Sequence, residues 1–267
     1  MKASCANRQD VFVNETPNDR RDLKLMAKLS LPEEREPPWS LLSAGLTLFA
    51  MFVCLTIIGP ALVAMMSGGD VLLSSEFTLS WTFGMALTSI FVLVNRRSSA
   101  ESWRAMSLSR GELPLPLALL AGIALALALD VLVSLASGGF WPLPLIWNFQ
   151  ARGAHGLLLA LLLLVVLQPL AETLVFQAVL LPRLRWTFGS WRGLIGAAAA
   201  YTILYLLVFI PPYPFYDGFW HGIVFPAGIG IFFCLLKVCT RSSVAVLVAR
   251  MGAGLIFTLT ALALVSS

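Results

Sequence analysis

The sequence predicts an all-α integral membrane protein, a polytopic bundle of about seven transmembrane helices. Of its 267 residues, 58% are hydrophobic and only 12% are charged, whereas about 25% are charged in an ordinary soluble domain. Seven apolar stretches approach or reach the ~20 residues that a helix needs to cross ~30 Å of hydrocarbon. They cover residues 41–66, 78–95, 113–137, 156–181, 193–210, 220–238 and 243–265. The lipid bilayer is therefore the first expected partner.

Lys and Arg residues fall in every second loop. Seven precede residue 40, four lie in the loop 96–112 and three in the loop 182–192, and Arg241 follows the sixth stretch. The alternate loops carry Arg152 alone. Because Lys and Arg accumulate on the cytoplasmic side of a membrane, this pattern predicts a cytoplasmic N-terminus. It fits a bacterial inner membrane or a photosynthetic membrane equally well.

The chain divides into three parts. Residues 1–40 are polar and bury too little apolar surface to fold alone, so they are expected to form a disordered cytoplasmic tail, within which Met26 is an alternative start. Residues 41–112 are expected to form two helices and a basic loop, and residues 113–267 the main transmembrane core. The tail has no apolar segment of the kind that a secretory signal contains.

Composition also excludes several classes of function. No basic patch is interleaved with aromatic residues as in nucleic-acid-binding proteins, so no nucleic-acid partner is expected. The four cysteines lie in the tail or in apolar stretches without paired spacing, which favours neither disulfides nor zinc. The sequence predicts no metal and no cofactor.

Three ionisable residues, Asp130, Glu172 and Arg250, fall inside apolar stretches, and each is a candidate functional residue because charge in hydrocarbon is costly. Glu172 is eleven residues before Arg183, and Arg250 is nine residues after Arg241. At 1.5 Å per helical residue these separations correspond to depths of ~16 Å and ~13 Å. Because the two helices are antiparallel, the depths predict a buried Glu172–Arg250 ion pair.

Two interpretations of Glu172 follow. Without a cation, a buried carboxylate becomes a stronger base and suits general base catalysis. Paired with Arg250, it stays ionised and weakly basic, which favours a structural role. Gln168 lies one turn before Glu172 and is positioned to donate to it. Asp130, near the outer end of its helix, is expected to meet His155 or interfacial water.

Small residues recur around Arg250 at a spacing of four. Ala245, Ala249 and Ala253 form a stripe on one face of the last helix. Such a stripe allows a neighbouring backbone to approach closely, so tight helix packing is expected beside Arg250.

Residues 169–180, Pro-Leu-Ala-Glu-Thr-Leu-Val-Phe-Gln-Ala-Val-Leu, resemble the first motif of the CAAX prenyl protease and bacteriocin-processing family of intramembrane glutamate proteases. The family pattern reads Pro-Ile-x-Glu-Glu-Leu-x-Phe-Arg-Gly-x-Leu. Glu172 is retained, whereas Thr173 replaces the second Glu, Gln177 the Arg and Ala178 the Gly.

Two later motifs of the family have in-frame counterparts. Residues 205–209 fit Phe-x-x-x-His by spacing, which puts Phe209 at the His. The passage 228–243 resembles the approach to His-x-x-x-Asn, which puts Arg250 at the His and Gly254 at the Asn. The chain's two histidines, His155 and His221, are expected near the outer ends of their helices.

The resemblance implies peptide hydrolysis in which a Glu activates water while His and Asn residues stabilise the oxyanion. Because most of these residues are replaced here, we predict a catalytically inactive member, a pseudoprotease that binds other membrane proteins as a scaffold or as an assembly or escort factor. A weakly active peptidase using Glu172 is one alternative. The other is a small transporter or channel subunit with Asp130, Glu172 and Arg250 along its path.

Overall fold

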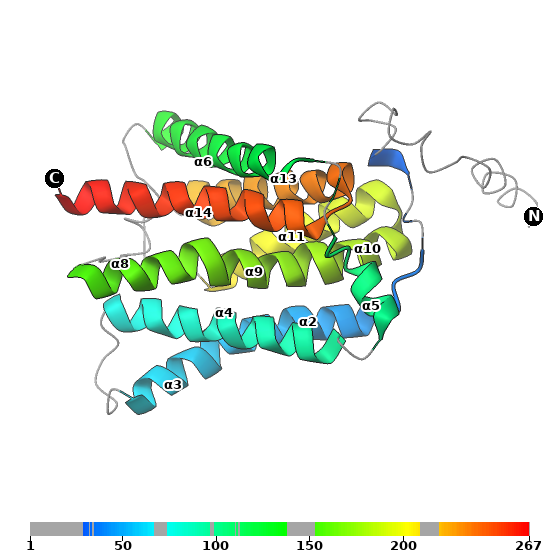
Figure 1. Cartoon of the computed structure of the whole chain (residues 1–267), viewed down its shortest axis with the longest axis horizontal. Helices are drawn as coiled ribbons and strands as arrows, with labels where there is room; N and C mark the ends of the chain where they lie inside the picture. Colours follow the sequence, from blue (N-terminus) through cyan, green and yellow to red (C-terminus); the bar gives the residue numbers. More distant parts are fainter. Residues whose placement is uncertain are drawn as a thin grey trace, which may run out of the picture.

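The computed structural model describes residues 29–31, 33, 35–66, 74–96, 99–109, 111, 113–137, 153–208 and 219–266. Within them the chain is helical, and seven helices are long and apolar enough to cross a membrane, as predicted (Figure 1). In chain order the elements are α2 (Leu41–Val53), η2 (Cys54–Ile58), α3 (Gly59–Met66), α4 (Ser74–Arg96), α5 (Ala100–Ala105), α6 (Leu115–Ser137), α8 (Gly153–Leu161), η3 (Leu162–Leu167), α9 (Gln168–Glu172), η4 (Thr173–Leu180), α10 (Leu181–Phe188), α11 (Ser190–Val208), η5 (Trp220–Val224), α13 (Phe225–Thr240) and α14 (Ser243–Ser266).

The fourth span lies at the centre of the bundle. Segments α8, η3, α9, η4 and α10 follow one another directly, and η3 and η4 are π-helical, with a wider turn than the α segments. Each π segment ends just before a proline, Pro169 or Pro182, which lacks the N–H of a regular helical bond and crowds the preceding turn. All eight residues of η4 are buried, which is typical of a helix enclosed by neighbours on every side.

Helix α14 packs closely against α6 through small residues. Ala245, Ala249 and Ala253 are all buried, as the stripe predicts. On α6, Gly122 lies so close to α14 that a Cβ atom added to it would overlap the carbonyl oxygen of Ala249. The backbones therefore approach closely beside Arg250.

Gly122→Ala is expected to lower the free energy of unfolding by about 1–3 kcal/mol, the usual cost of overpacking a filled interior. Gly45→Ala is the matched control, because a Cβ atom at Gly45 meets nothing within 4 Å and alanine favours a helix over glycine. Unfolding of both variants in mixed detergent micelles tests the difference. Equal stability of the two variants would contradict the close approach.

The residues immediately before α2 pack on the bundle. We call the described residues 29–31, 33 and 35–40 the N-terminal strap. Leu29 and Trp39 are buried, the Trp39 indole donates to the carbonyl of Val179 (3.1 Å), and the Arg96 guanidinium carbon lies 4.9 Å from the centre of the Trp39 ring. The expected disordered tail therefore does not extend to residue 40, because these contacts offset the entropy lost on ordering the strap. Residues 1–28 lie outside the described part of the chain.

Candidate functional site

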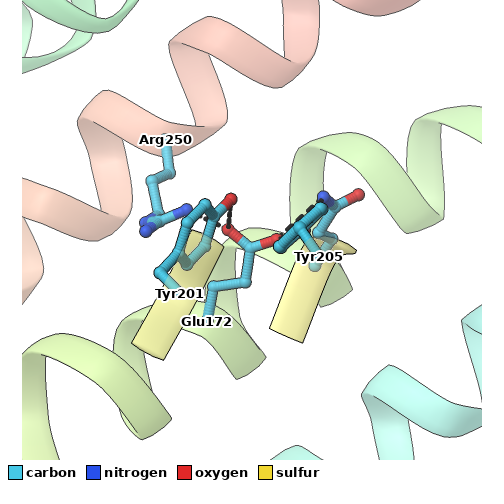
Figure 2. Close-up of polar contacts among 5 residues, drawn as sticks. Glu172, Tyr201, Tyr205 and Arg250 are labelled. Carbon is cyan, nitrogen blue, oxygen red and sulfur yellow. Dashed lines mark hydrogen bonds and ion pairs between the residues drawn. The ribbon is translucent and has the colours of Figure 1, made fainter. Parts of the chain in front are cut away.

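Glu172 is the last residue of α9 and lies between the two π-helical segments of the central span. Its side chain is only 2% exposed. In Figure 2 one side of the carboxylate faces Tyr201 and Arg250, and the other side faces Tyr205. Three helices, α9, α11 and α14, thus contribute to the same buried point.

Both carboxylate oxygens of Glu172 are occupied. Oε1 accepts hydrogen bonds from Gln168 Nε2 (2.8 Å) and from the Tyr205 hydroxyl. Oε2 accepts from the Tyr201 hydroxyl (3.0 Å) and from Arg250 Nη1, which also forms an ion pair with it. An ionised carboxylate offers about four acceptor positions, so the four donors fill them.

Arg250 is held as firmly as its partner. Its side chain is 4% exposed, and its guanidinium carbon lies 4.3 Å from the centre of the Phe233 ring and 5.1 Å from that of Tyr201, distances typical of cation–π contacts. When the Gln177 amide is oriented to satisfy both of its ends, its oxygen accepts from Arg250 Nη2 (3.1 Å) and its nitrogen donates to the Glu172 carbonyl (3.1 Å). The buried cation is therefore neutralised and hydrogen-bonded through both Nη atoms, whereas its Nε has no hydrogen-bond partner among the described residues.

The structure brings several of the residues selected from the sequence to this point, but not all. Gln168, Glu172, Gln177 and Arg250 meet directly, and Gly254 lines the adjoining cavity. The Thr173 hydroxyl is buried and has no hydrogen-bond partner among the described residues.

Other selected residues lie elsewhere. Asp130 is half-buried on α6 and is not among the residues that line the cavity. Phe209 and the side chains of His155 and His221 lie outside the part of the chain that the structure describes. The expected contact between Asp130 and His155 therefore stays a prediction.

Sequence reasoning missed the two tyrosines. Tyr201 and Tyr205 are one helical turn apart on α11, with ring centres 4.6 Å apart, and Gln168 Nε2 also donates to the Tyr205 hydroxyl (2.7 Å). The sequence does contain a pattern that indicates them. Gln168 and Glu172 are four residues apart, as are Tyr201 and Tyr205, and this spacing puts each pair on one face of its helix.

A cavity of about 50 Å³ adjoins the ion pair, enough for about one or two water molecules. Its polar wall is formed by Glu172, Arg250 and the tyrosines, and its apolar wall includes Phe225 and Phe257. Among the residues whose side chains are described, no three His, Cys, Asp or Glu gather as metal ligands. The arrangement suits a buried, neutralised polar network better than a site for an ion.

Comparison with known proteins identifies the region that contains the site. A family model described as type II CAAX prenyl endopeptidase Rce1-like matches residues 154–256. No curated protein and no solved structure matches the chain. The matched segment runs from α8 into α14 and includes every member of the cluster around Glu172. The match confirms the resemblance seen in residues 169–180.

Proposed function

We propose that this integral membrane protein, which carries an Rce1-like domain at residues 154–256, is a catalytically inactive member of the CAAX-protease-like family. It acts by binding other membrane proteins, as a scaffold or as an assembly or escort factor. The observation that supports this proposal is the saturation of the Glu172 carboxylate by four donors.

Saturation opposes hydrolysis because a general base must accept a proton from water. The base needs a free acceptor position within hydrogen-bond reach of that water. At Glu172 the positions are taken by Gln168, two tyrosines and Arg250. The cation also stabilises the ionised carboxylate and makes it a weaker base.

The residues at the family's oxyanion-stabilising positions also favour a catalytically inactive protein. We infer that Tyr205, rather than Phe209, takes the place of the second-motif histidine, because its hydroxyl lies on Glu172. Arg250 stands at the third-motif histidine, and Gly254, at the Asn, has no side-chain donor. Tyr205 and Arg250 are thus engaged with the carboxylate, and loss of a single oxyanion donor alone costs ~10²–10³ in rate.

A weakly active peptidase is the second candidate, and the cavity of about 50 Å³ beside Glu172 favours it. A water molecule there would lie near the carboxylate. For it to react, one of the four donors on Glu172 would have to leave first. This candidate therefore predicts cleavage that depends on Glu172.

The test compares protein termini in membranes from three strains by terminal-peptide mass spectrometry. The strains express the wild-type chain, no chain, and Glu172→Leu/Arg250→Leu, with wild-type expression lowered to match the abundance of the double variant. The double variant removes the carboxylate without leaving Arg250 unpaired. A scaffold predicts that no terminus depends on Glu172 and that the double variant rescues the deletion phenotype.

The opposite outcome is equally specific. A new terminus that is present in the wild type and absent from both other strains would establish a peptidase and identify its substrate. Glu172→Gln serves as a second variant, because it keeps the side-chain shape while removing the base. Because this variant leaves Arg250 without its counter-charge, its abundance is matched to that of the wild type, and loss of the same terminus at equal abundance would assign the cleavage to Glu172.

A further inference from the structure

Helices α5 and α10 and the N-terminal strap lie at the same end of the bundle (Figure 1), and they contribute residues to a charged cleft. Its volume is about 560 Å³, within the ~300–1,000 Å³ typical of ligand sites. The bundle contributes the basic side chains of Arg104, Arg185, Lys237 and Arg241 and the acidic side chain of Glu101, and the strap itself contributes Arg35. The cleft does not share a lining residue with the cavity at Glu172.

The strap shows what chemistry this cleft recognises. In the cleft, Glu33 pairs with Arg185 Nη1 (3.5 Å). Glu36 pairs with Arg183 Nη1 (2.8 Å), which does not line the cleft. Arg185 Nη2 also donates to the backbone carbonyl of Leu31 (2.6 Å). One buried arginine thus contacts both a carboxylate and a main-chain oxygen of the strap, at two residues that are not helical.

The neighbouring helix start adds a second backbone contact. The Ser190 hydroxyl lies 3.0 Å from the carbonyl oxygen of Ser30 and 2.8 Å from that of Leu31. Contacts to main-chain oxygens do not depend on which side chains the segment carries. They suit a peptide of another chain as well as the strap.

The Lys237 ammonium in this cleft has no carboxylate among its hydrogen-bond partners. Its side chain is 6% exposed, and its ammonium donates to Ser243 Oγ (2.9 Å) and, at 3.5 Å, to the Met106 carbonyl. Both acceptors are neutral, and Glu33 of the strap, the carboxylate that acts on Lys237 electrostatically, forms its ion pair with Arg185 instead. Burial of a cation with no carboxylate in direct contact is costly, so an additional carboxylate in the cleft would be favoured.

We propose that this cleft binds an acidic segment of another membrane protein and that the N-terminal strap is its intramolecular competitor. The strap is tethered at Trp39, so its effective concentration at the cleft is high, ~mM for a short linker. A partner segment without this tether is free to place a carboxylate at Lys237 as well. The assignment stands whether or not Glu172 is catalytic.

The experiment measures peptide binding to the full-length chain in nanodiscs of neutral lipid. The probe is a fluorescent peptide with the strap's own sequence, residues 29–39, and the control peptide has Gln at its three Glu positions. The protein variant Glu33→Gln/Glu36→Gln weakens the strap. Since the Glu33 and Glu36 side chains are 29% and 58% exposed, their pairs contribute little to stability, and the variant is expected to fold.

We expect the acidic peptide to bind the Glu33→Gln/Glu36→Gln chain several-fold more tightly than the wild type, and the Gln peptide to bind both chains more weakly than the acidic peptide. Adding Arg185→Gln or Lys237→Gln should weaken binding at least several-fold. Adding Arg192→Gln, at an exposed position that does not line the cleft, should leave it unchanged.

Two results would overturn the proposal. One is equal binding of the acidic and Gln peptides, or equal binding to the wild type and the weakened-strap chain. The other is loss of peptide binding when the nanodiscs contain phosphatidylglycerol, which would assign the cleft to anionic lipid headgroups instead. Thermal unfolding of each variant shows whether a lost affinity reflects the cleft or the fold.

Discussion

Arg250→Leu is expected to lower the free energy of unfolding by about 3–5 kcal/mol, the usual cost of removing one partner from a buried ion pair. The substitution leaves the Glu172 carboxylate buried at 2% exposure without its cation. Tyr201, Tyr205 and Gln168 still donate to it, but neutral donors do not cancel a charge in a site remote from water. Chain abundance in membranes should fall with stability.

The double variant Glu172→Leu/Arg250→Leu should recover most of this loss, because both charges disappear together and the leucines fill similar space. Recovery is expected to be incomplete. The Tyr201 hydroxyl loses its carboxylate acceptor, whereas Gln168 and Tyr205 remain bonded to each other (2.7 Å).

Unfolding in mixed detergent micelles measures both effects, with exposed Arg192→Leu as the matched control. A double variant as unstable as the less stable single variant would show that Glu172 and Arg250 are not energetically coupled. A stable Arg250→Leu chain would remove the structural role assigned to this arginine and weaken the case for an inactive site.

The seven spans could be predicted from the sequence because the thickness of hydrocarbon fixes their length. The first was predicted at 41–66 and is Leu41–Met66. The fourth was predicted to end at residue 181, but it continues to Phe188. Hydropathy falls at Arg183 and Arg185, whose charges are paired by the strap, so the helix extends beyond its apolar stretch.

Depth along the helices placed Glu172 and Arg250 at one level, but rotation about the helix axes could not be predicted. The π-helical segments η3 and η4 flank Glu172, and each widened turn shifts which residues share a face. The family spacing put the second-motif histidine position at Phe209, one helical turn after Tyr205. The strap was missed for a different reason, since a segment without helical or strand periodicity gives no pattern to detect.

Gly254→Asn, which introduces the residue that the family resemblance puts at this position, is expected to destabilise the protein by about 2–5 kcal/mol, from overpacking together with burial of an amide. A Cβ atom at Gly254 would overlap the carbonyl oxygen of Leu164 and lie 3.4 Å from the Cα atom of Val165. Helix α14 is therefore too close to η3 for any side chain at this position.

Gly254→Ala should also lower the free energy of unfolding, but by less. Gly45→Ala should not lower it, because a Cβ atom at Gly45 meets nothing within 4 Å. Unfolding in mixed micelles again provides the measurement. A Gly254→Asn chain as stable as the wild type would mean that α14 can move away from η3 and that an asparagine can still enter the site. If the substitution is destabilising, the missing oxyanion donor and the close helix packing have a common cause. Restoring catalysis would then require moving a helix as well as replacing Tyr205 and Arg250.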